Sequence, residues 1–212
     1  MKNGLVIANG KIEDLEMLKD QIHSHDYILC ADGGIRYIYE TNLKVDAIIG
    51  DLDSVDEKFP GFIKRNNITI IKFPVEKDET DTELAIEYLI EKGCKQITLM
   101  GGIGSRIDHT LANILLLKRL AQRNVLGKLI DENNTIVLSS DYYKIKRKEG
   151  HYVSIIPITN SGVIVSLKGF YYPLEDSLIG YGSTLGISNR IIEDEGEIFI
   201  KKGEALIIES KD

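Results

Sequence analysis

The segment AIIGDLDSVDEKF, residues 47–59, contains the pattern that decides the fold. A short apolar run ends directly in two aspartates, and Ser54 with Glu57 then matches the capping box that opens a helix. An apolar run without polar alternation is typical of a strand that is covered on both faces, as in a parallel sheet. The segment therefore predicts a buried strand, a polar loop and a helix.

The same order repeats through the first 130 residues. Amphipathic segments separate the apolar runs, and Leu15, Leu18 and Ile22 share one face of the first of them. Thr80 with Glu83 predicts a helix start, and Gly93 predicts the end of that helix. The other apolar runs are LVIA (5–8), YILCA (27–31), ITIIKF (68–73), QITLM (96–100) and VLGKLI (125–130). Alternation of strand and helix indicates an α/β domain with a parallel sheet.

After about residue 131 the pattern changes. Helical periodicity nearly vanishes, and the runs become short and rich in β-branched and aromatic residues. They are TIVLSS, YYKIKR, HYVSIIPI, GVIVSLKGF, EIFIKKG and ALIIES. We therefore expect two domains, an α/β domain over residues 1–131 and a small antiparallel β-sandwich over residues 132–212.

The composition narrows the class of partner. The chain has 26 Lys and Arg against 33 Asp and Glu, a net charge of -7, which argues against a nucleic-acid partner. Its two cysteines lack CxxC spacing and indicate reduced thiols. The apolar run at residues 5–8 is too short for a signal peptide, and no run approaches the ~20 residues of a membrane span. We expect a cytoplasmic protein that does not bind a membrane.

Acidic or glycine-rich loops follow four of the expected strands. They are ADGG (31–34), GDLDS (50–54), EKDETD (76–81) and GGIGSRIDH (101–109). Ligands of an open parallel sheet gather at the carboxyl ends of its strands. Four such loops at one edge of the sheet therefore predict a ligand site.

Asp51 and Asp53 are the first candidates for chemistry. In an extended segment residues i and i+2 point the same way, so two carboxylates at this spacing can converge on one divalent cation. A polar turn in which Asp53 helps to start the helix is the alternative. A third interpretation is an aspartate nucleophile with its acid partner, because Asp51, Asp53 and Val55 match the DxDx(T/V) motif of haloacid-dehalogenase-type phosphatases. In that family the motif usually follows the first strand, whereas here it follows the third.

The loop GGIGSRIDH is suited to bind phosphate. Its glycines, Gly101, Gly102 and Gly104, allow a ligand to approach the backbone closely. A helix expected from about Asp108 to Arg123 presents amide donors at its N-terminus. Arg106 can bind phosphate oxygens with its guanidinium fork. The alternative is an ordinary turn with Asp108 as the helix cap.

Two other loops offer charged groups. Lys77 can neutralise phosphate charge, and Asp78 and Asp81 can join a metal shell or orient a hydroxyl; a solvated loop ending in the Thr80 cap is the alternative. The segment ADGG, with Asp32 and Gly33, fits either a tight turn or close approach to a nucleotide. His109 is a further candidate, although a lone histidine is usually structural. The phosphate loop GxxxxGK[ST] is absent, so a nucleotide would be held by other means.

The ordered set ADGG, GDLDS, KDETD and GGIGSRIDHTLAN, followed by GISN (186–189), resembles the thiamine pyrophosphokinase family over nearly the whole chain. The resemblance implies an α/β domain that binds ATP and Mg²⁺ and a β-sandwich that binds thiamine and dimerises. It also implies a homodimer with active sites at the subunit interface. The implied reaction transfers pyrophosphate from ATP to the hydroxyethyl oxygen of thiamine and releases AMP.

The resemblance also implies roles for particular residues. Asp51, Asp53 and Asp81 would be the catalytic and metal-binding acids, with Asp81 or Asp53 as the base, and Ser188 and Asn189 would bind thiamine. With the loops described above, the ATP side would comprise Asp32, Gly33, Lys77, Asp78, Gly101, Gly102, Arg106, Asp108 and His109. A non-catalytic thiamine or nucleotide sensor is the alternative from another class, and the complete set of acidic loops argues against it.

Overall fold

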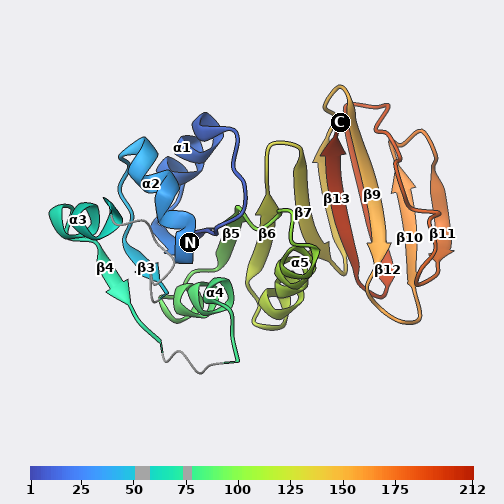
Figure 1. The fold of residues 1–212 in the computed structure, drawn as a ribbon. Helices are drawn as coiled ribbons and strands as arrows, with labels where there is room; N and C mark the ends of the chain where they lie inside the picture. Colours follow the sequence, from blue (N-terminus) through green and yellow to red (C-terminus); the bar gives the residue numbers. More distant parts are fainter. Residues whose placement is uncertain (51–57, 74–77) are drawn as a thin grey trace. The chain divides into compact units, whose positions relative to one another are not determined.

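The computed structural model describes residues 1–50, 58–73 and 78–212. Figure 1 shows the course of the chain, which divides into two compact units, Met1–Glu132 and Asn133–Asp212. Each unit is described by itself. Ser54 and Glu57, the expected helix cap, lie outside the described residues.

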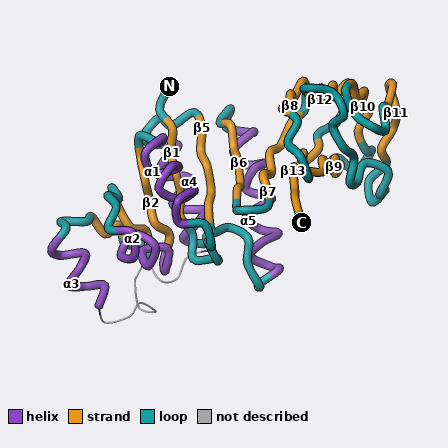
Figure 2. Tube along the Cα trace, turned by 90° about the horizontal axis from the view of Figure 1, so that it is seen from above, coloured by secondary structure: helices purple, strands orange, loops and turns teal. Residues whose placement is uncertain are grey.

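The first unit is built on a parallel sheet. Its neighbouring strands are all parallel and follow the order β4-β3-β2-β1-β5-β6, part of which can be followed in Figure 2. The strands are β1 (Asn3–Ile7), β2 (Tyr27–Ala31), β3 (Ala47–Ile49), β4 (Thr69–Ile71), β5 (Gln96–Met100) and β6 (Leu126–Ile130). The parallel sheet predicted from the apolar runs is confirmed.

Helices cover both faces of this sheet. They are α1 (Leu15–Ser24), α2 (Ile35–Thr41), α3 (Lys58–Arg65), α4 (Asp81–Glu91) and α5 (Ile107–Gln122), and the short 3-10 turn η1 (Asp32–Gly34) precedes α2. Leu5 shares a buried core with Leu18 of α1, whereas a Cβ on the neighbouring Gly4 would meet Leu89 of α4 at 2.6 Å. Successive strand residues therefore pack against different helices, which explains the continuous apolar runs.

The predicted ends of α4 are also confirmed. The backbone N–H of Glu83 donates to the Thr80 hydroxyl over 3.2 Å, and Thr80 is the N-cap. Gly93 follows the last turn with a φ of +82°, the left-handed conformation that a helix end favours. Among the helices of the described residues, none combines the length and apolar character that crossing a bilayer requires.

The second unit is an antiparallel sandwich. One sheet contains β7 (Asn134–Ser139), β13 (Ala205–Lys211) and β9 (His151–Pro157); the other has the order β11 (Leu174–Ile179), β10 (Val163–Lys168), β12 (Glu195–Lys202) and β8 (Tyr142–Lys146). Val137 and Ile207 of the first sheet share one buried core with Val165 and Ile198 of the second. The sandwich was predicted, but β11 was not. This edge strand has only one buried residue, and the polar run Glu175–Ser177 interrupts the apolar residues of its sequence LEDSLI.

Candidate functional site

The strand order places a crevice beside β1. The chain proceeds from β1 outward to β4 and then returns to β5, on the other side of β1. Connections that leave in opposite directions separate at such a point, and ligands of α/β sheets bind there. A cavity of about 360 Å³ lies at the carboxyl ends of these strands, lined by the loops after β1 and β5 and by residues that begin η1, α4 and α5.

Several of the predicted site residues lie together in this cavity. Its lining includes Asp32, Asp81, Gly101, Gly102, Arg106 and His109. Gly33, Asp78 and Asp108 are described but do not belong to the lining. Asp51, Asp53 and Lys77 lie outside the described residues, and their roles stay predictions.

Glycines bring the two loops of the crevice into contact. The N–H of Gly10 donates to the carbonyl of Gly101 over 2.8 Å. A Cβ on Gly10 would lie 2.3 Å from that oxygen, and a Cβ on Gly101 would lie 2.5 Å from the carbonyl oxygen of Ala8. Gly101 also has a φ of +66°, which disfavours other residues. Side chains at these positions would force the two loops apart.

Side chains of α5 form hydrogen bonds with the backbone of the glycine loop after β5. The buried Asn113 donates its Nδ2 to the carbonyl of Gly102 over 2.8 Å. The Thr110 hydroxyl lies 3.1 Å from the N–H of Gly104, from which it accepts, and 3.2 Å from the carbonyl of the same residue. The loop is therefore fixed against the helix by hydrogen bonds within the protein, which preorganises it for a ligand.

The N-terminus of α5 differs from the expectation. The helix begins at Ile107 with Arg106 as its N-cap, and the side chain of Arg106 makes no capping hydrogen bond. Asp108 is therefore not the cap, because its carboxylate instead accepts from Nε and Nη2 of Arg106, at 3.2 and 2.6 Å. This forked pair lowers the pKa of Asp108 and raises that of Arg106. A hydrogen bond from the backbone N–H of His109 also lowers the pKa of Asp108, and the other amide donors of the first turn suit an anion.

Two acids approach the carboxyl end of β3. Gly50, with a φ of +140°, ends this strand, and a Cβ there would lie 3.4 Å from Oδ2 of Asp81 and 3.3 Å from Cα of Asp32. Asp32 itself has a φ of +47°, an uncommon conformation for a residue with a side chain and one that occurs at functional sites. Asp51 follows Gly50 in the sequence. Within residues 1–50, 58–73 and 78–212, three metal-binding side chains do not gather.

Ser188 and Asn189 lie together in the second unit, in different environments. Asn189 is buried, and its amide accepts from the N–H of Tyr172 at 3.0 Å and donates to the carbonyl of the same residue at 2.8 Å. Ser188 is exposed, and its N–H donates to the hydroxyl of Ser154 over 3.0 Å. Asn189 therefore holds a loop in place, while Ser188 is exposed beside it.

Sequence reasoning assigned no role to several residues that line the cavity. They include Asn9 and Gly10 after β1, and Thr110 and Asn113 on α5. The loop after the first apolar run has no paired glycines, and its acids, Glu13 and Asp14, lie several residues beyond the strand, so it did not stand out. The rule that ligands bind beyond strand ends would have found it, had it been applied to this strand as well.

The fold and the site define a class of protein: an α/β unit with a preformed cavity suited to an anionic ligand at its switch point, followed by a β-sandwich. Family comparisons are more specific. Residues 18–127 match the family described as "Thiamin pyrophosphokinase, catalytic domain", and residues 142–207 match "Thiamin pyrophosphokinase, vitamin B1 binding domain". The chain belongs to the thiamin pyrophosphokinase family, as the ordered loops predicted.

Individual relatives agree with this assignment. The chain is 32% identical to the thiamine pyrophosphokinase of Bacillus subtilis, over 100% of both chains, and the crystal structure of that protein matches with a TM-score of 0.90. The crystal structure of thiamin pyrophosphokinase from Geobacillus thermodenitrificans matches with a TM-score of 0.85 at 27% identity, over 100% of this chain and 98% of the other. The predicted fold class and enzyme class are confirmed.

Proposed function

We propose that this chain binds ATP in the cavity between the loops after β1 and β5 and transfers its pyrophosphoryl group to the hydroxyethyl oxygen of thiamine. One observation carries the proposal. The preorganised glycine loop and the N-terminus of α5 share a cavity with Asp32 and Asp81. Amide donors suit the phosphates, and the acids suit a cation and an acceptor for the hydroxyl proton.

The reaction exchanges one phosphorus–oxygen bond for another. The thiamine oxygen forms a bond to the β-phosphorus, the bond from that phosphorus to the oxygen shared with the α-phosphate breaks, and AMP leaves with this oxygen. Asp81 lines the cavity and is a candidate to accept the hydroxyl proton, as Asp53 is by sequence. The chain contributes mainly alignment and charge stabilisation, on which such transfers depend. Arg106 and His109 line the same cavity and are the proposed contacts to the phosphates of ATP.

The acids at the end of β3 fit Mg²⁺. The Asp81 carboxylate reaches the end of this strand, and the predicted ligands Asp51 and Asp53 follow directly in the sequence. Carboxylate oxygens are the ligands that Mg²⁺ prefers. When bound, the ion would offset the phosphate charge that an acidic site otherwise repels.

Thiamine is proposed to contact the second unit, Asn133–Asp212. The exposed hydroxyl of Ser188 is available to a ligand, and Asn189 positions the surrounding loop. Exposed apolar side chains nearby in sequence, Tyr181, Leu185 and Ile187, are consistent with a covered surface in a homodimer whose active sites lie at the interface. A cytoplasmic location stays a prediction.

Product analysis tests the reaction. The protein is incubated with thiamine, ATP and Mg²⁺, and we expect thiamine diphosphate and AMP in equal amounts. ADP with thiamine monophosphate would contradict pyrophosphoryl transfer. Binding without turnover would favour a sensor, and phosphate release from small phosphomonoesters without ATP would favour a phosphatase.

Substitution of the acids tests their roles. We expect Asp81→Asn to lower kcat by at least ~100-fold, because the variant loses a proton acceptor and a charge at the reacting groups. Asp20→Asn on the exposed face of α1 makes the same chemical change and serves as the control. Asp51→Asn and Asp53→Asn should likewise abolish turnover while the fold stays intact. Near-normal activity in both of these variants would refute the metal clamp.

A further inference from the structure

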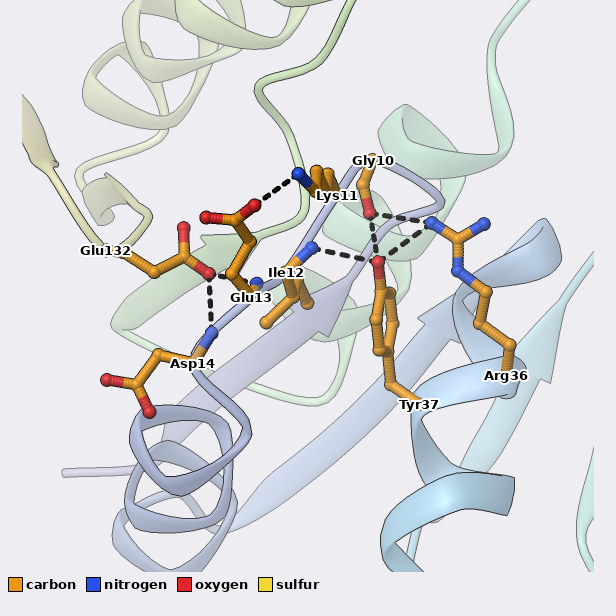
Figure 3. A network of polar contacts seen from close by, with 8 residues as sticks. All are labelled: Gly10, Lys11, Ile12, Glu13, Asp14, Arg36, Tyr37 and Glu132. Carbon is orange, nitrogen blue, oxygen red and sulfur yellow. Dashed lines mark hydrogen bonds and ion pairs between the residues drawn. The ribbon is translucent and has the colours of Figure 1, made fainter.

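The hydroxyl of Tyr37 joins α2 to the loop after β1 (Figure 3). It donates to the carbonyl of Gly10 at 2.7 Å, and it accepts from the N–H of Ile12 and from Nη2 of Arg36, each at 2.8 Å. A tyrosine hydroxyl has one donor and two acceptor positions, so every position is used. The Tyr37 side chain is buried, whereas its partner Arg36 is half-buried.

Gly10 transmits this contact to the other wall of the cavity. Its carbonyl accepts from the Tyr37 hydroxyl and also from Nη2 of Arg36 at 3.0 Å, while its N–H donates to the carbonyl of Gly101. Nη2 of Arg36 also donates to the carbonyl of Asn9 at 2.8 Å. Hydrogen bonds thus run without a gap from α2 through the loop after β1 to the glycine loop after β5.

The far end of the same segment is held separately. The carboxylate of Glu132 accepts from the N–H of Glu13 and, at 2.9 Å, from that of Asp14, the N-cap of α1 (Figure 3). The segment from Asn9 to Asp14 is therefore bonded at both ends. Of these anchors, Tyr37 and Arg36 hold the end that lines the cavity.

We propose that Tyr37 is a positioning residue for the nucleotide, acting through Gly10. Tyr37 is not part of the cavity lining, so its effect is carried by the loop. Without the hydroxyl, the N–H of Ile12 and the carbonyl of Gly10 lose a buried partner, and the loop gains other positions. The apparent affinity for the nucleotide is then the intrinsic affinity multiplied by the fraction of molecules whose loop is in the binding position. This inference rests on the proposed ATP site.

Tyr37→Phe tests the proposal, with Tyr39→Phe as the matched control. Both changes remove one hydroxyl from α2, but the ring of Tyr39 packs edge-on against Phe59 and Phe62 of α3, at 5.3 and 5.2 Å. We expect Tyr37→Phe to raise the KM for ATP about tenfold. This is the factor that results when the loop is in the binding position in about one molecule in ten. The KM for thiamine and kcat should stay within about twofold, because only ground-state binding of the nucleotide changes. Tyr39→Phe should change none of these values.

The pattern of changes in kcat and in the two KM values separates a positioning role of Tyr37 from a merely structural one. Loss of folded protein would lower apparent kcat and leave both KM values unchanged, and that result would overturn the proposal. Faster amide hydrogen exchange at Gly10 and Ile12 in Tyr37→Phe would support it, because it reports release of the loop. An unchanged KM for ATP, or an equal rise in both KM values, would overturn it.

A second variant covers the case in which Tyr37→Phe fails to fold. Arg36→Met removes the bonds to the carbonyls of Asn9 and Gly10 from a half-buried side chain, and we expect the same selective rise in the KM for ATP. Calorimetric binding of a non-hydrolysable ATP analogue measures the same effect without turnover. A wild-type protein that binds the analogue but makes no thiamine diphosphate would contradict the proposed function and leave the role of Tyr37 measurable.

Discussion

Replacing Gly10 by alanine adds one methyl group where the two loops of the cavity touch. The new Cβ would lie 2.3 Å from the carbonyl oxygen of Gly101 and 2.7 Å from that of Ile103, whereas ordinary contact begins at 3.4 Å. Backbone atoms block it on both sides, so a side-chain rotation cannot relieve the clash. The loops must separate by about 1 Å, a shift that weakens the hydrogen bond from Gly10 to Gly101.

The cost follows from these two effects. Forcing an extra methyl group into a packed site costs ~1–3 kcal/mol. The weakened hydrogen bond adds ~0.5–1.5 kcal/mol. We therefore expect the free energy of unfolding to fall by roughly 2–4 kcal/mol. The KM for ATP should also rise, because the separated loops form opposite walls of the cavity.

Gly61→Ala is the control, and it should change the free energy of unfolding in the opposite direction. Gly61 lies inside α3, and a Cβ there would meet nothing within 4 Å. Alanine in a helix interior is favoured over glycine by ~0.5–1 kcal/mol, so this variant should be more stable. Urea unfolding of both variants and the wild type measures the differences in the free energy of unfolding, provided that the dependence on urea concentration has the same slope in all three. A Gly10→Ala variant as stable as the wild type would refute the close approach of the loops.

Two further predictions concern polar side chains that are wholly or partly buried. Asn113→Ala removes the side-chain hydrogen bond that Asn113 donates to the carbonyl of Gly102, and we expect urea unfolding to show a loss of ~1–3 kcal/mol; an unchanged midpoint would contradict this. Burial lowers the pKa of His25, whose Nε2 lies 2.9 Å from the Thr98 hydroxyl, below its ordinary value of 6.5. The unfolded chain then binds the proton more tightly, so stability present above pH 6.5 is lost as the pH falls through the folded pKa. Unfolding midpoints at several pH values should show this loss in the wild type and in the exposed-site control His23→Gln, and a smaller loss in His25→Gln; equal losses in all three would count against it.

The elements of the fold could be predicted because their signals are local. Continuous apolar runs give strands covered on both faces, and the cap at Thr80 depends on residues only three positions apart. Strand β11 could not be predicted in this way. It lies at a sheet edge, where solvent tolerates polar residues. Its sequence therefore lacks the continuous apolar run that marks the other strands.

The sequence predicted several of the loops that form the site, but not the full set of residues that line the cavity. Acids and glycines after strands indicate a ligand at one sheet edge, and Asp32, Asp81 and Gly101 lie in the cavity. The exact crevice depends on strand order, which places β5 beside β1 and β4 at the edge. Strand order results from pairing between distant segments, and periodicity does not encode it. The loop at Asn9 and Gly10 was therefore missed, although it forms one wall.

Tyr37 illustrates the same limit for a single side chain. In the sequence it belongs to an apolar stretch of α2, where an aromatic residue is expected to fill the core, and its ring does so. The partners of its hydroxyl come from residues about 25 positions earlier, at Gly10 and Ile12. A buried tyrosine needs such a partner, whereas phenylalanine would serve packing alone. The hydroxyl therefore marks a connection between α2 and the cavity wall, which Tyr37→Phe isolates from the packing of the ring.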